Sequence, residues 1–272
     1  MKIILLCNGA ANQRALAYRL SSVVELSAIA VIRPLPRKSE RIGHRLMRGV
    51  LGHPLRRAWF SLLTQYDYTY PTFPDVPLSY HEGVNSESVL SLVDEIQPDL
   101  VLVSGTDLLR HPLIEAIHRW GKVVNLHTGI SPYIKGGPNC TNWALFIKRP
   151  DLIGNTVMWL DTGIDSGNIV STERTPLKGD ESLSDLHRKV MDHGHDLYCR
   201  AVACIVSGSE VPSIKQSSLA AGRVFLSKEW TAAAALRTVC NYYRIFNSRM
   251  LSVRGAEVLI PLPACTPGHT ER

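Results

Sequence analysis

The sequence predicts an α/β protein built on a doubly wound, mostly parallel sheet of the Rossmann-like kind, with a short C-terminal appendage. Short apolar runs of strand length alternate along the chain with segments whose apolar residues recur at helical spacing. The apolar runs end in asparagine, glycine or aspartate, which are typical of the loops after strands. Strands that alternate with helices favour a parallel sheet covered by helices on both faces.

The N-terminal half contains most of the expected sheet. Strands are expected at residues 2–7, 24–32 and 99–104, followed by a strand that ends at residue 127. Helices are expected from residue 12 to about 20, within 33–57, over 86–96 and over 111–120. Residues 61–84 are rich in proline and aromatic side chains, so we expect an irregular segment there.

The C-terminal half is expected to add a hairpin and a long helix. A helix over 139–147 precedes strands at 155–160 and 168–172, with the glycine-containing loop 161–167 between them. A long helix over 181–206 is expected to start near a cap at Asp180, and another helix covers 228–246. Because composition changes after residue 206, we expect a domain over 1–206 and a small extension over 207–272.

Charge and cysteine content limit the partners and the cellular location. The net charge of +6 favours anionic partners without choosing among them. The six cysteines show no Cys-x-x-Cys spacing, so we expect reduced thiols and no metal site. The N-terminal apolar run is too short for a signal peptide, and no run approaches membrane-span length. We therefore expect a soluble cytoplasmic protein.

Residues 33–57 carry eight Lys and Arg residues against one acid, Glu40. Apolar residues recur there at helical spacing, which indicates a basic amphipathic helix. Such a helix is compatible with RNA contact, attachment to an anionic membrane surface, or capture of an anionic substrate. It is equally compatible with a solvated face that binds no partner.

The turn at residues 8–12 is a candidate anion site. It links the first strand to a helix, and free N–H groups at a helix start point toward whatever lies there. Gly9 and Asn12 are therefore candidate substrate-binding residues. A purely structural turn explains the pattern as well, because neither a Gly-x-Gly-x-x-Gly motif nor a Walker lysine is present.

Three polar side chains are candidates for catalysis. Asn125 and His127 lie two residues apart at the end of a strand, so both side chains leave the same face of the sheet. Ligands of open α/β sheets bind at this end of the strands. Asp165 follows 38 residues later in a glycine-containing loop.

These residue types suit acyl transfer. An asparagine amide and a histidine N–H can stabilise a developing oxyanion, while a carboxylate orients the histidine and helps to remove a proton. No nucleophile-elbow motif is present, so the nucleophile is expected to arrive with the substrate, and an amine fits this role. Taken singly, each residue is equally well explained as a turn former or a satisfied polar group.

The sequence resembles the folate-dependent formyltransferase family in two motifs. One is Asn125-Leu-His127 followed by Pro132 and Gly136, and the other is Leu160-Asp-Thr-Gly-Ile-Asp165-Ser-Gly-Asn-Ile169. The family includes glycinamide ribonucleotide, methionyl-tRNA and amino-sugar formyltransferases. The likeness covers residues 1–206, which would then be the catalytic domain.

The resemblance implies roles for residues at this site. Asn125, His127 and Asp165 would be catalytic, and N10-formyltetrahydrofolate would donate the formyl group. Its pterin would lie between Leu108-Leu109 and the loop that carries Asp161, Gly163 and Ile164. The acceptor would contact Gly9, Asn12, Gly136 and Asn139, and a homodimer is possible.

Departures from the family pattern bear on the acceptor. Ala10-Ala11 replaces the Gly-Ser pair usual in the purine enzymes, and the region after residue 206 is short for a tRNA formyltransferase. Residues 137–143 look most like enzymes that modify amino sugars on nucleotides. The resemblance thus implies a small anionic amine acceptor, an amino sugar linked to a nucleotide. The alternatives are methionyl-tRNA, a hydroxyornithine-type amine, or a non-catalytic protein that binds folate or a nucleotide.

Overall fold

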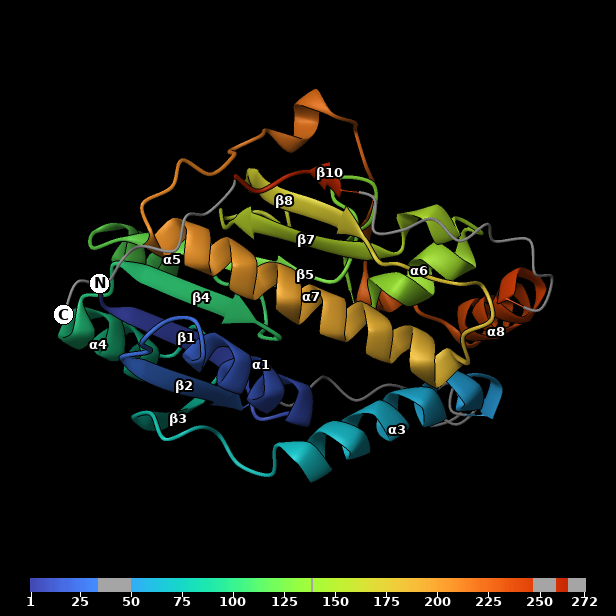
Figure 1. The fold of residues 1–272 in the computed structure, drawn as a ribbon, viewed down its shortest axis with the longest axis horizontal. Coiled ribbons are helices and arrows are strands. Elements are labelled where there is room, and N and C mark those ends of the chain that lie inside the picture. Colours follow the sequence, from blue (N-terminus) through green and yellow to red (C-terminus); the bar gives the residue numbers. More distant parts are fainter. Residues whose placement is uncertain (34–49, 138, 247–257, 264–272) are drawn as a thin grey trace.

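The protein is described by a computed structural model, which covers residues 1–33, 50–137, 139–246 and 258–263 (Figure 1). Its centre is an eight-stranded sheet in the order β10-β8-β7-β5-β4-β1-β2-β3. These strands are β1 Ile3–Asn8, β2 Ala28–Arg33, β3 Leu78–Glu82, β4 Leu100–Ser104, β5 Lys122–His127, β7 Gly154–Trp159, β8 Ile169–Arg174 and β10 Val258–Ile260. The sheet from β3 to β5 is parallel, and the strands beyond β5 are antiparallel.

Helices cover both faces of this sheet, which confirms the predicted α/β class. The helices are α1 Ala11–Ser21, α3 His53–Thr69, α4 Glu87–Ile96, α5 His111–His118, α6 Cys140–Phe146, α7 Leu183–Val206 and α8 Ala232–Phe246. α7 crosses one face beside α1 and α3, while α4 and α5 lie on the opposite face (Figure 1). Within the described residues, no helix is long and apolar enough to cross a membrane.

Strand alternation produces the two halves of the core. Leu5 of β1 belongs to the cluster that includes Leu16 of α1 and Val202 of α7. Its neighbour Leu6 belongs to the cluster on the other face, which includes Val93 of α4. Successive residues of β1 therefore bury both faces of the strand, as expected for a parallel strand between helical layers.

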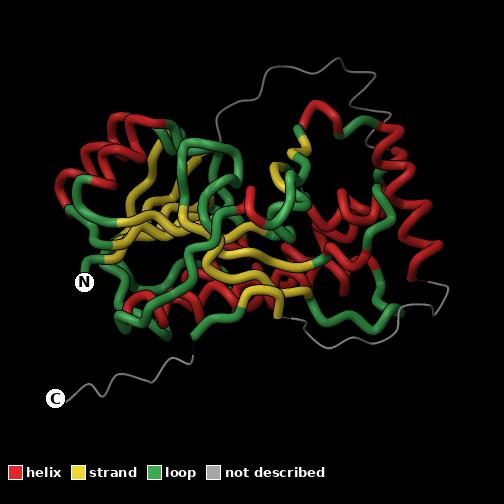
Figure 2. Tube along the Cα trace, turned by 90° about the horizontal axis from the view of Figure 1, so that it is seen from above, coloured by secondary structure: helices red, strands yellow, loops and turns green. Residues whose placement is uncertain are grey.

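A further apolar core lies at the end of the molecule where α6 and α8 gather (Figure 2). Trp143 of α6 stacks on Phe225 with ring centroids 4.6 Å apart. Phe225 belongs to β9 (Val224–Phe225), which pairs in parallel with the short strand β6 (Lys135–Gly136). This small second sheet joins the C-terminal part of the chain to the loop after β5.

Several local predictions are wrong. Residues 61–84 are irregular only in part, because α3 continues to Thr69 and β3 spans Leu78–Glu82, which leaves residues 70–77 as the loop between them. Leu55, Leu62 and Tyr66 bury one side of α3, so packing stabilises the helix despite its aromatic content. The second strand begins at Ala28 instead of residue 24, and the long helix is capped by Ser182, whose hydroxyl accepts from the Asp185 N–H.

Two other expectations have mixed outcomes. Most of the basic segment 33–57 lies outside the described residues, and Arg56 and Arg57 belong to α3. Among the described residues, four cysteines are free thiols, namely Cys7, Cys140, Cys199 and Cys240. Cys204 is disulfide-bonded, which corrects the expectation that the cysteines are reduced throughout.

Candidate active site

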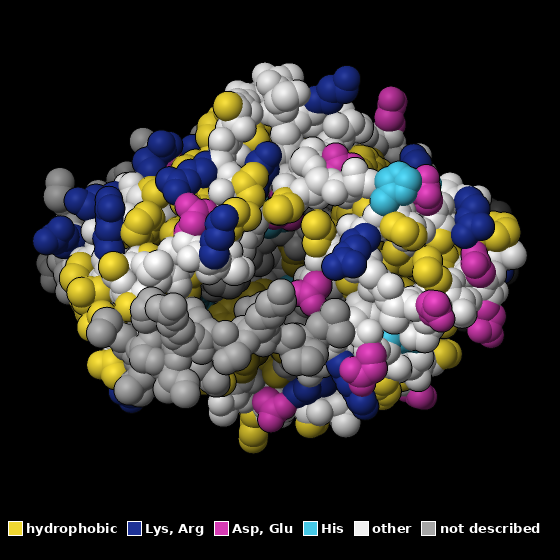
Figure 3. All heavy atoms as spheres, turned by 180° about the vertical axis from the view of Figure 1, so that it is seen from behind, with side chains coloured by type: hydrophobic (Ala, Val, Ile, Leu, Met, Phe, Trp, Pro, Cys, Tyr) yellow, Lys and Arg dark blue, Asp and Glu magenta, His cyan; other side chains and the backbone are white. Residues whose placement is uncertain are grey.

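The candidate site lies where β4 and β5 end. Tyr198 of α7 is fully buried, accepts a hydrogen bond from the Val103 N–H at 2.9 Å and donates to the Val124 carbonyl at 2.8 Å. The hydroxyl therefore satisfies backbone groups of two adjacent strands near their carboxyl ends. A cavity of about 640 Å³ opens beyond this point. Seen from behind, the surface is hollowed near its middle (Figure 3).

Asn125 and His127 both line this cavity, as does Asp165. Val123 packs in the core beneath α4 and α5, while Val124 and Leu126 pack beneath α1 and α7. Alternation therefore directs Asn125 and His127 to the same face of β5. The Asn125 side chain makes no hydrogen bond to any described residue, so its amide is free to bind a ligand.

His127 has an acceptor near each ring nitrogen. Its Nδ1 lies 3.4 Å from Asp165 Oδ2, and its Nε2 lies 2.9 Å from the Ile134 carbonyl oxygen. The Cys140 sulfur lies 3.5 Å from Nε2. Only the doubly protonated imidazolium carries a proton on both nitrogens, so the surroundings favour the charged form.

The pKa of His127 follows from these contacts. Burial alone would lower it, because only 7% of the residue is exposed. The Asp165 carboxylate opposes burial, and the Cys140 sulfur and the Ile134 carbonyl add to its effect. Together these groups raise the pKa of His127 to about 10, so the ring is cationic at neutral pH.

Asp165 is held in place through its carboxylate and its backbone. Asp165 Oδ2 accepts a hydrogen bond from the Gly136 N–H at 2.7 Å. The residue has a φ of 45°, in the left-handed region that non-glycine residues seldom adopt. Within the same loop, Asp161 Oδ1 accepts from the Gly163 N–H at 3.0 Å and from the Ser166 hydroxyl at 2.6 Å. These bonds fold the β7–β8 loop back on itself.

The residues expected to bind the folate co-substrate lie on two loops around the cavity. Leu108 and Ile164 both line it, and 47% and 39% of their surfaces are exposed. Leu109 also lines the cavity but is buried. Asn85 holds the first loop by donating to the Leu108 carbonyl and accepting from the Arg110 N–H. Exposed apolar side chains on opposing loops suit the faces of a flat ring, so these residues fit a pterin.

Of the four residues expected to bind the acceptor, two line the cavity and two do not. Asn12 and Gly136 line the cavity. Gly9 does not, and its carbonyl accepts from Arg14 at 3.0 Å. Asn139 does not line it either, because its side chain accepts from the Asn142 N–H and caps α6.

Sequence reasoning missed several residues at the site. Gln13 and Trp59 line the cavity, and Gln13 Oε1 is buried without a hydrogen-bond partner among the described residues. Cys140 also contacts His127 through its sulfur. Gln216, from beyond residue 206, donates to the backbone of the Asp165 loop. No motif marks these positions, and only the helical spacing of residues around Trp59 offered a signal.

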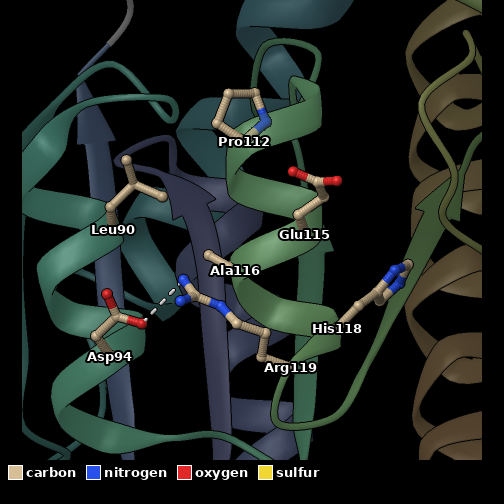
Figure 4. A pocket seen from close by; sticks show the side chains of 7 residues that line it. All are labelled: Leu90, Asp94, Pro112, Glu115, Ala116, His118 and Arg119. Atoms are coloured by element: carbon tan, nitrogen blue, oxygen red, sulfur yellow. Dashed lines mark hydrogen bonds and ion pairs between the residues drawn. The ribbon is translucent and has the colours of Figure 1, made fainter.

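Other features of the surface are less suited to chemistry. A second hollow lies against α4 and α5, where Arg119 pairs with Asp94 at 3.3 Å (Figure 4). The side chains of both partners are more than half exposed, so this ion pair contributes little to the stability of the fold. Among the described residues, no group of three His, Cys, Asp or Glu side chains has the geometry of a metal site.

Comparisons with known proteins point to one family. Residues 69–202 match the formyl transferase family model. The chain is 27% identical over 154 residues to a methionyl-tRNA formyltransferase of Syntrophus aciditrophicus, a match that covers 57% of this chain and 48% of that protein. The chain thus spans about half the length of the curated relatives it matches.

Solved structures show the same fold. A sugar N-formyltransferase from Shewanella has a TM-score of 0.56 at 16% identity, covering 84% of this chain and 78% of that one. A phosphoribosylglycinamide formyltransferase from Anaplasma phagocytophilum has a TM-score of 0.54 at 17% identity, covering 84% and 98%. These similarities concern the fold alone.

Proposed function

We propose, because residues 69–202 match the formyl transferase family model, that the protein is an enzyme that formylates a primary amine. N10-formyltetrahydrofolate is the donor. The amine nitrogen bonds to the formyl carbon, and the bond from that carbon to N10 breaks. The amine loses one proton, N10 gains one, and the products are a formamide and tetrahydrofolate.

The observation that carries this proposal is the arrangement of His127. A cationic imidazole and the free Asn125 amide lie on one face of β5 at the cavity. The Asn125 amide presents N–H groups that stabilise negative charge as it develops on the formyl oxygen, and the cationic ring of His127, whose own N–H groups face Asp165 and Ile134, adds its positive charge at the site. Asp165 keeps His127 protonated and, directly or through water, accepts the proton that the amine must lose.

The proposed acceptor is a small anionic molecule, an amino sugar linked to a nucleotide. The buried and unpaired Gln13 Oε1 provides an acceptor for a hydroxyl or amine proton of the ligand. Trp59 provides an aromatic surface at the same cavity, which suits a sugar or base. The net charge of +6 attracts a phosphate-bearing molecule.

The test is formyl transfer to a panel of amines. The protein is incubated with N10-formyltetrahydrofolate and a nucleotide-linked amino sugar, a hydroxyornithine-type amine or methionyl-tRNA. Transfer is measured as tetrahydrofolate release and as the mass gain of one CO unit on the amine. The expected result is transfer to the amino sugar. Binding of the folate without release of tetrahydrofolate for any amine would support a non-catalytic binding protein and contradict the proposal.

Methionyl-tRNA is the second candidate acceptor, because a matched curated relative is a methionyl-tRNA formyltransferase. A tRNA acceptor makes many phosphate contacts, so its affinity falls steeply as salt is raised. A small acceptor with one or two phosphates shows a shallow salt dependence. Measuring the acceptor KM at several salt concentrations therefore separates the two candidates.

A further inference from the structure

Gln216 has a side chain that reaches the loop carrying Asp165. It lies in the short helix η2 (Gln216–Ser218), outside the family-matched residues 69–202, and only 5% of it is exposed. Its Nε2 donates to the Asp165 carbonyl at 2.7 Å and to the Gly167 carbonyl at 2.8 Å. Because both partners are carbonyl oxygens, which only accept hydrogen bonds, the side-chain atom that faces them must be the amide nitrogen and not the amide oxygen.

This contact matters because of the backbone at Asp165. A residue with a side chain holds a φ of 45° only where its surroundings over-determine that conformation. Apart from Gln216, the hydrogen bonds that shape this loop come mainly from Asp161, within the loop itself. Gln216 ties the loop to a part of the chain that lies 51 residues further on.

The partner of Asp165 on the other loop is held by the same C-terminal segment. Gly136 donates its N–H to Asp165 Oδ2, and the N–H groups of Lys135 and Gly137 donate to the carbonyls of Arg223 and Phe225 at 3.0 and 3.1 Å. A Cβ on Gly136 would lie 2.2 Å from the Phe225 oxygen. The close pairing of β6 with β9 therefore fixes the direction of the Gly136 N–H.

We propose that Gln216 is a positioning residue that, together with β9, keeps the Asp165 carboxylate in contact with His127. Gln216 does not line the cavity, so it acts through Asp165 and not on the substrate. The effect of Gln216 on the contact between Asp165 and His127 does not depend on which reaction the protein catalyses. Only the expected fall in kcat rests on the proposed function.

The test compares Gln216→Met with the wild-type protein. Methionine keeps the length and the apolar packing beside Met158, but it removes both hydrogen-bond donors. Ser218→Ala is the matched control, because Ser218 lies in the same turn, is exposed and, among the described residues, its hydroxyl bonds only to the Lys215 carbonyl. The pKa of His127 is measured by NMR titration of the imidazole in protein with labelled histidine.

In Gln216→Met the pKa of His127 is expected to fall by about 1–3 units, because a displaced carboxylate no longer favours the imidazolium. The kcat for formyl transfer is expected to fall about 10- to 100-fold. Ser218→Ala should match the wild type in both measurements. A loss of stability alone would not lower the pKa of His127 in folded protein, so the titration separates positioning from a structural role.

An unchanged pKa of His127 in folded Gln216→Met would overturn the inference. If this variant does not fold, Gln216→Asn provides the same test, because its amide is one methylene too short to reach both carbonyls. A wild-type protein that formylates no amine would contradict the proposed function. The titration would still decide the role of Gln216 in that case.

Discussion

The pair formed by His127 and Asp165 predicts a specific dependence of stability on pH. The folded pKa of about 10 lies above the ordinary value of 6.5, so the folded protein retains a proton that the unfolded chain loses. The contribution of this pair to the free energy of unfolding has its full value below about pH 6.5 and is lost as pH rises through about 10. Between these values the free energy of unfolding falls by about 1.4 kcal/mol per pH unit, on the order of 5 kcal/mol in total.

Asp165→Asn removes the carboxylate that holds the proton. Burial then dominates, and the pKa of His127 falls to or below its ordinary value. Urea unfolding is measured at intervals from about pH 6 to about pH 10 for both proteins. The gap between their free energies of unfolding is expected to be widest near pH 6 and to close as pH approaches 10, because other titrating groups cancel in the difference.

Asp161→Asn is the control for this experiment. Asp161 lies in the same loop, but its carboxylate bonds to Gly163 and Ser166 and makes no ion pair with His127 among the described residues. Its stability curve should run parallel to that of the wild type. If the Asp165→Asn curve were also parallel to the wild type across this range, the imidazolium assignment would be refuted.

Three further substitutions have expected outcomes. Asn125→Ala should lower kcat by a factor of roughly 10²–10³ in a tetrahydrofolate-release assay, because an oxyanion donor acts in the transition state. The KM for the folate should be almost unchanged. An unchanged kcat would show that Asn125 takes no part in the mechanism. Tyr198→Phe should reduce the free energy of urea unfolding by about 1–3 kcal/mol, since it removes the hydrogen bonds that the buried hydroxyl makes to the backbone of two strands. Gly136→Ala should destabilise the fold, because a Cβ would meet the Phe225 oxygen at 2.2 Å and the φ of Gly136 is +85°. Gly137→Ala is the control, because a Cβ there has open space, and this variant should unfold like the wild type. Equal urea-unfolding midpoints for the two variants would contradict this prediction.

The sequence predicted the sheet and the common face of Asn125 and His127 because these follow from local periodicity. Strand alternation places the side chains at residues 123, 125 and 127 on one side whatever the rest of the chain does. Asp165 was assigned to the same site through the resemblance of its loop to a family motif. The separation of 38 residues between His127 and Asp165 in the sequence does not by itself show that their two loops lie close together in the fold.

Other parts of the structure depend on tertiary contacts that leave no local signal. The helix over His53–Thr69 was missed although Leu55, Leu62 and Tyr66 have helical spacing, because proline and aromatic residues indicated an irregular segment. Gln216 looks like any loop glutamine, and its importance arises only when it meets carbonyls 49 and 51 residues away. The boundary placed at residue 206 remains a prediction, and Gln216, β9 and β10 all lie beyond it.

The strand β10 has a consequence for how the chain behaves in solution. It pairs antiparallel with β8, and the Ile260 carbonyl accepts from the buried Ser171 hydroxyl at 2.7 Å. Ile214 bridges the start of β8 at Ile169, so without β10 the later part of β8 would present open backbone groups, and such an edge is a template for recruiting strands from other molecules. Three residues near the end of the chain thus shield the sheet from intermolecular aggregation.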